Sequence, residues 1–92
     1  MTVERLIKAI GMRIFIKYYD YFKRGTDVIG KLEDEGFTLK SCRSRQSKAQ
    51  KVFRENLQIQ VLDMVITANS KVSQETKSKA EVFLKEEYKT QN

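Results

Sequence analysis

The sequence predicts an all-α protein, a single domain over residues 1–92 built as a small bundle of four to five helices. Three observations favour this class. The chain has no proline and only four glycines, its apolar residues recur at spacings of three and four, and small polar residues stand where helices would begin. An apolar fraction of 40% beside 33% charged residues is typical of a folded domain.

The composition also excludes several classes of function. No apolar run reaches the roughly 18 residues of a membrane span, and charged residues interrupt the N-terminal segment where a secretory signal would be apolar. The chain has no histidine and one cysteine, Cys42, which we expect to be a packing residue. No phosphate-binding glycine pattern occurs. We therefore expect a cytoplasmic protein without membrane contact, enzymatic activity, metal, cofactor or small-molecule ligand.

Thr2 is a suitable N-cap for a first helix that we expect to run to about Arg24. One apolar stripe comprises Val3, Leu6, Ile7, Ile10, Ile14, Tyr18 and Tyr21, and a second, on the opposite face, comprises Met12, Phe15, Ile16, Tyr19 and Phe22. This pattern predicts a helix whose C-terminal half is buried on both faces. Residues 13–22 are also rich in β-branched and aromatic side chains, so a strand is the alternative there.

A short second helix should follow Gly25, with Thr26 as its N-cap and residues 27–35 as its body. We expect it to bury Val28, Ile29 and Leu32 and to end in the exposed acidic residues Glu33, Asp34 and Glu35. Gly36 then stops the helix. Phe37 is expected to be buried under the turn.

The third helix should begin after its N-cap, Thr38. Its expected apolar face comprises Leu39, Cys42, Ala49 and Phe53, which lie close together at about 100° per residue. Its polar face comprises Lys40, Arg43, Ser44, Ser47, Lys51 and Arg54, with Arg45 and Lys48 at the two edges. The helix is therefore amphipathic and its outer face is basic.

Two further segments complete the bundle. Residues 57–66 carry two apolar stripes and could continue the third helix, begin a new helix after a bend near Asn56, or start as a strand over residues 57–61. Asn69 and Ser70 should end this segment. Ser73 should cap a last helix over about residues 74–89, which turns Ala80, Phe83, Leu84 and Tyr88 inward and leaves Glu87 exposed.

Charge is concentrated in one place. Residues 38–54 contain six lysines or arginines and no acidic residue, which equals the net charge of +6 of the whole chain. Surface helices usually mix acids and bases because like charges one turn apart repel each other. A merely solvated face, an acidic protein partner and a membrane surface are the weaker alternatives. A nucleic acid is the favoured partner, because it releases condensed counterions when it binds a row of cations.

The order of elements sharpens this interpretation. A short helix, a turn with a glycine and a second helix with a basic outer face resemble, over residues 26–54, the helix-turn-helix motif of DNA-binding proteins. The resemblance implies that the second helix enters the major groove by its first turns, with Thr38, Lys40, Ser41, Ser44 and Arg45 nearest the base edges. Arg43, Lys48, Lys51 and Arg54 would hold phosphates, with Ser47 on the same face.

The sequence thus predicts a double-stranded DNA-binding protein, a small transcriptional regulator or an accessory protein. A homodimer is expected, because two segments with two apolar faces need more cover than one small domain supplies. The alternatives are a helical protein-interaction module and an RNA-binding protein.

Overall fold

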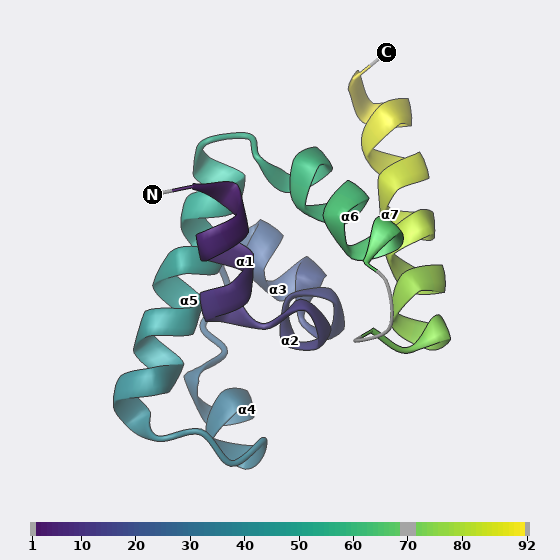
Figure 1. The fold of residues 1–92 in the computed structure, drawn as a ribbon. Helices are drawn as coiled ribbons and strands as arrows, with labels where there is room; N and C mark the ends of the chain where they lie inside the picture. Colours follow the sequence, from purple (N-terminus) through teal and green to yellow (C-terminus); the bar gives the residue numbers. More distant parts are fainter. Residues whose placement is uncertain (1, 69–71, 92) are drawn as a thin grey trace.

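The computed structural model describes residues 2–68 and 72–91, and within these ranges the chain forms helices and no strand (Figure 1). The helices are α1 (Val3–Ile10), α2 (Met12–Lys17), α3 (Tyr19–Arg24), α4 (Ile29–Asp34), α5 (Leu39–Arg54), α6 (Gln58–Thr67) and α7 (Gln74–Gln91). The all-α prediction is confirmed, and helices replace the strands considered for residues 13–22 and 57–61. The described ranges hold more helices than expected because the first predicted helix is divided.

That division occurs at two residues. Thr2 caps α1 as predicted, since its hydroxyl accepts the Arg5 backbone N–H at 3.2 Å. The continuous helix to Arg24 is wrong, because Gly11 adopts a φ of +93° that ends α1. Tyr18, with φ −112° and ψ 24°, separates α2 from α3. Three short helices therefore change direction where one rod was expected.

The changes of direction bring both apolar stripes into one core. The core comprises Leu6, Ile7, Ile10, Ile14, Phe15, Ile16, Tyr19, Phe22, Val28, Leu32, Cys42, Ala49, Val52, Val61, Leu62, Val65 and Ala80. Tyr19 is only 2% exposed, and its ring stacks on Phe83 at a centroid distance of 4.2 Å. A single chain thus covers Tyr19, which lies in one of the two segments that we expected a second subunit to cover.

α4 starts later than the sequence indicates. The N-cap predicted at Thr26 is wrong, since the first helical residue is Ile29 and its N–H is accepted by the Asp27 carboxylate at 2.9 Å. The preceding Val28 N–H donates to the side-chain oxygen of Gln46, at 2.6 Å, which ties the start of α4 to α5. The helix ends at Asp34, one residue earlier than expected.

α5 begins where predicted, because the Thr38 hydroxyl accepts the Ser41 N–H at 3.2 Å. Its buried strip consists of Cys42, Ala49 and Val52. Leu39, expected in the core, is 44% exposed. It lies roughly 80° around the helix from Ala49 and in the first turn, so the strip that packs on the bundle does not include it.

A bend separates α5 from α6, as one of the alternatives anticipated. Asn56 adopts a left-handed φ of +57°, and α6 begins two residues later. α6 and α7 pack against each other, on the side of the molecule opposite α4 and α5, with α1 to α3 between (Figure 1). The predicted end of α6 at Asn69 and Ser70 lies outside the described residues.

α7 has its N-cap at Ser73, as predicted. The Ser73 hydroxyl accepts the Thr76 backbone N–H at 3.2 Å. The predicted inward face is partly wrong. Tyr88 is 53% exposed, whereas Glu87 is only 3% exposed. Glu87 lies about 20° around the helix from Ala80, and Tyr88 about 80°, so Glu87 is on the inward face, where Tyr19 and Lys23 of α3 and Gln58 of α6 donate to its carboxylate. None of the helices in the described ranges combines the length and apolar content needed to cross a membrane.

Candidate nucleic-acid interface

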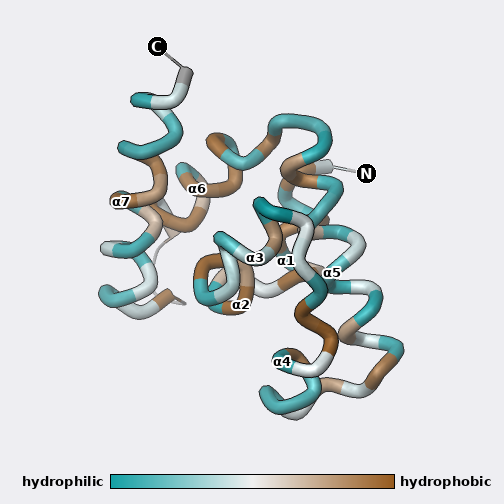
Figure 2. Tube along the Cα trace, turned by 180° about the vertical axis from the view of Figure 1, so that it is seen from behind, coloured by the Kyte–Doolittle hydropathy of each residue, from teal (hydrophilic) through white to brown (hydrophobic). Residues whose placement is uncertain are grey.

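The polar residues predicted for a nucleic-acid surface lie along α5, which has hydrophilic segments over much of its length in Figure 2. Those that are exposed are Thr38, Lys40, Arg43, Ser47 and Arg54, and those that are half-buried are Ser41, Ser44, Arg45, Lys48 and Lys51. Lys40, Ser47 and Lys51 lie within about 40° of one another, directly opposite the buried Ala49. The basic outer face expected from the sequence is therefore present on one side of α5.

Most cations on this face have no carboxylate partner. Lys51 lies 3.7 Å from Glu55, in a pair that solvent reaches on both sides. Within residues 2–68 and 72–91, none of the other four cations of this face forms an ion pair; these are Lys40, Arg43, Lys48 and Arg54. The Lys48 ammonium instead donates to the Ser44 hydroxyl. The outer face of α5 thus keeps an uncompensated positive charge.

Glu35, the last acidic residue before α5 in the sequence, faces α2. The Glu35 carboxylate accepts hydrogen bonds from Lys17 at 2.6 Å, from the Tyr18 hydroxyl at 2.9 Å and from Arg13 at 3.3 Å. The hydrogen bond from Lys17, followed by that from Tyr18, lowers the pKa of Glu35 to about 2. The sequence placed this residue in an exposed acidic run, and that expectation is wrong because the side chain is held by α2.

A second acid is buried between α3, α6 and α7. The Glu87 carboxylate accepts hydrogen bonds from Lys23 at 2.6 Å, from the Tyr19 hydroxyl at 2.9 Å and from the Gln58 amide at 3.2 Å. Burial opposes the charged form, but these donors outweigh it and lower the pKa of Glu87. Burial and the bond to the carboxylate raise the pKa of Tyr19. Glu87 therefore compensates Lys23 and no cation of α5.

Arg45 differs from its neighbours on α5. Its guanidinium donates to the Ile10 carbonyl and, at 3.0 Å, to the Ser41 hydroxyl, and it lies over the Phe37 ring at 3.9 Å from the centroid. The sequence placed Arg45 near the base edges. The structure turns its side chain towards the end of α1, where it fastens α5 to the break at Gly11. Phe37, expected to be buried, is half-buried beneath this guanidinium.

Cys42 is buried, as expected for a packing residue, and its sulfur lies 3.7 Å from the Phe37 carbonyl oxygen. Burial raises the pKa of its thiol, which keeps the sulfur protonated and unreactive. Among the residues that the structure describes, no cluster of three or more histidine, cysteine, aspartate or glutamate side chains is placed to hold a metal ion.

No protein-family model, curated protein or solved structure matches this chain.

Proposed function

We propose that the protein binds double-stranded DNA through the outer face of α5 and serves as a small transcriptional regulator or DNA-binding accessory protein. One observation carries the proposal. Lys40, Arg43, Lys48 and Arg54 share one face of a 16-residue helix and form no ion pair within the described chain. A row of cations of this kind gains affinity for a polyanion from the release of condensed counterions.

The placement of the side chains divides the proposed contacts. Lys40 and Ser44, in the first turns of α5, are the side chains proposed to contact base edges, as the first turns of the recognition helix do in helix-turn-helix proteins. Arg43, Lys48, Lys51 and Arg54 are the side chains proposed to contact phosphates. Arg45 takes no base contact in this proposal, because its guanidinium is committed to the Ile10 carbonyl and the Phe37 ring.

A homodimer belongs to the same proposal, because two copies of α5 would double the phosphate contacts. Less apolar surface is available for a dimer contact than the sequence predicted, since Tyr19 is covered within one chain. The apolar surface that supports it is on α6 and α7, where Ile59 and Ile66 are half-buried and Val82 is exposed. Sedimentation equilibrium should give about twice the chain mass of 10.8 kDa, and a value of one chain mass at high concentration would rule the dimer out.

The test of DNA binding is a pair of charge reversals. The variant Arg43→Glu with Arg54→Glu alters two exposed cations of α5, and the matched control Lys85→Glu with Lys89→Glu alters two exposed cations of α7. Both variants lower the net charge by the same amount. Fluorescence anisotropy with a labelled DNA duplex should show at least about tenfold weaker binding for the α5 variant and a change within about twofold for the control.

Circular dichroism serves to confirm that both variants keep their helices. Equal weakening by both variants would mean that only net charge matters, and no weakening by either would exclude the α5 surface. Titrating duplex RNA and single strands under the same conditions distinguishes the nucleic acids. Tighter binding to RNA than to duplex DNA would mean that RNA, and not double-stranded DNA, is the ligand of this surface.

A further inference from the structure

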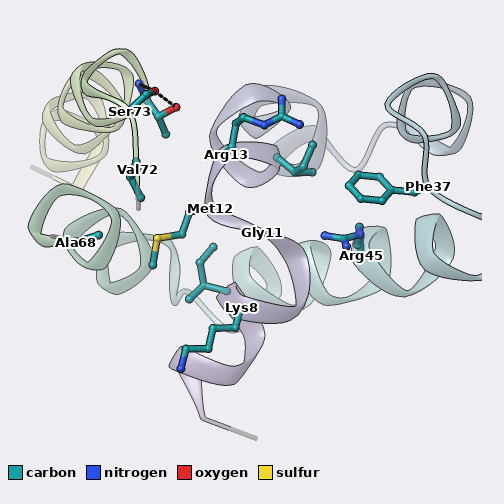
Figure 3. A pocket seen from close by; sticks show the side chains of 12 residues that line it. Lys8, Gly11, Met12, Arg13, Phe37, Arg45, Ala68, Val72 and Ser73 are labelled. Carbon is teal, nitrogen blue, oxygen red and sulfur yellow. Dashed lines mark hydrogen bonds between the residues drawn. The ribbon is translucent and has the colours of Figure 1, made fainter. Parts of the chain in front are cut away.

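A groove of about 980 Å³ opens between the α1–α2 break, the turn before α5 and the start of α7 (Figure 3). It is distinct from the outer face of α5. Its described lining residues are Ile7, Lys8, Gly11, Met12, Arg13, Ile14, Phe37, Arg45, Ala68, Val72, Ser73 and Thr76. The volume is at the upper end of the range of small-molecule sites, roughly 300–1,000 Å³.

The lining is apolar, with positive charge and no carboxylate among its described residues. Its apolar side chains are Ile7, Met12, Ile14, Phe37, Ala68 and Val72. The two hydroxyl groups among the described lining residues bond to each other, because Ser73 donates to Thr76 at 3.0 Å. A ligand in this groove therefore meets hydrocarbon over most of its surface and finds few free partners for polar groups of its own.

Arg45 is the cation best prepared to receive an anion there. A guanidinium has five N–H donors, of which Arg45 uses one on the Ile10 carbonyl and one on Ser41. No other hydrogen bond of this group is formed within the described residues. Stacking on Phe37 fixes the plane of the guanidinium, and Figure 3 shows these two side chains together at one side of the groove. A guanidinium already fixed in place loses little conformational entropy when it binds a carboxylate.

The other two cations contribute less. Arg13 forms an ion pair with Glu35 at 3.3 Å, so its charge is already compensated. Lys8 is exposed and forms no ion pair within the described residues, so it adds positive potential at the rim. The charge of the groove is thus matched by one anionic group beside Arg45.

We propose that this groove binds an acyl carboxylate, a hydrocarbon chain that ends in a carboxylate group. Arg45 holds the carboxylate, and Met12, Ile14 and Val72 cover the chain. A peptide is a poorer occupant, since its backbone amides would lack partners on an apolar wall. This binding activity is additional to the proposed DNA binding and does not depend on it.

The first experiment uses decanoate and its neutral counterpart decan-1-ol, with isothermal titration calorimetry on the full chain. We expect one decanoate per chain and at least about tenfold weaker binding of decan-1-ol, because charge recognition is lost. Arg45→Met should weaken decanoate binding by a similar factor. Arg54→Met, on the outer face of the same helix, should leave it unchanged. Equal affinity for the acid and the alcohol, or an unaltered Arg45→Met variant, would overturn the proposal.

A second pair of variants keeps the test decisive if Arg45→Met fails to fold. Met12 lines the groove and is half-buried, so we expect the fold to accept a polar side chain there. Met12→Glu places a carboxylate in the wall and should weaken decanoate binding at least about tenfold, whereas Met12→Leu should retain it. Decanoate affinity that is the same in both variants, or the lack of any saturable binding to the wild type, would show that the groove is not the site.

Discussion

The Tyr19 hydroxyl donates a 2.9 Å hydrogen bond to the Glu87 carboxylate and so joins α3 to α7 across 68 residues of sequence. Lys23 and Gln58 donate to the same carboxylate, which leaves it buried but charged. A buried charge is stable only while its partners are in place. The position of the last helix therefore depends on this cluster as well as on apolar packing.

Removing the charge of Glu87 should destabilise the protein. Glu87→Gln leaves Lys23 without its counter-ion and replaces an acceptor of three hydrogen bonds by an amide, so we expect a loss of about 2–4 kcal/mol in the free energy of unfolding. The matched control is Glu86→Gln, at an exposed position one residue away, which should cost less than about 0.5 kcal/mol. Urea denaturation measures both, and equal effects would mean that the cluster adds nothing.

Acid should weaken the fold through Glu35 and Glu87, whose pKa values are both lowered in the folded state. A group with a lowered folded pKa adds stability above its unfolded pKa, and this stability is lost as pH falls towards the folded value. Thermal denaturation should therefore show a falling melting temperature from about pH 5 to pH 2. Glu35→Gln should flatten this profile, and a profile as steep as that of the wild type would refute the assignment.

Phe37 and Leu39 should differ in their sensitivity to truncation. Phe37→Ala removes a half-buried ring that supports the Arg45 guanidinium, and we expect it to cost about 2–3 kcal/mol. Leu39→Ala, at an exposed side chain two residues later, should cost about 0.5 kcal/mol or less. Comparable losses in urea denaturation would mean that the turn before α5 is packed differently.

Gly11 and Gly30 should respond in opposite directions to alanine. At Gly11 the φ of +93° is strained for alanine, and an added Cβ would lie 3.2 Å from the Arg45 guanidinium, so we expect a loss of about 1–3 kcal/mol. Gly30 lies inside α4, where a Cβ meets nothing within 4 Å, and alanine should add about 0.5–1 kcal/mol. Stability changes of the same sign would contradict the described conformation of Gly11.

Local signals in the sequence identified the features that depend on neighbouring residues. Thr2, Thr38 and Ser73 were recognisable as N-caps, since a cap involves only the next three residues. The basic face of α5 was equally readable from helical periodicity. By contrast, the break at Gly11 lies within an uninterrupted helical pattern of apolar residues, and nothing local distinguishes it from a glycine inside a helix.

The partners of the long-range polar residues could not be read in this way. Arg45 donates to the Ile10 carbonyl, 35 residues away in the sequence, and Glu87 accepts from the Tyr19 hydroxyl, 68 residues away. On a helical wheel at about 100° per residue both lie on the apolar side of their helices, Arg45 about 40° from Ala49 and Glu87 about 20° from Ala80, but a wheel does not give their partners. Only the folded arrangement, in which the α1–α2 break meets α5 and α3 meets α7, shows which groups hold them inside. The groove beside Arg45 is formed by residues from both halves of the chain, so no sequence motif predicts it.

The salt dependence of binding to duplex DNA tests most directly the claim that the unpaired cations of α5 contact phosphates. The logarithm of the association constant should fall linearly with the logarithm of salt concentration, with a slope of about −3.6 for four phosphate contacts at about −0.9 each, and a steeper one for more contacts. Arg54→Gln should reduce the magnitude of the slope by about 1, whereas Lys85→Gln on α7 should not change it. A slope near zero, or one that Arg54→Gln leaves unaltered, would contradict the assignment of α5 as the DNA-binding surface.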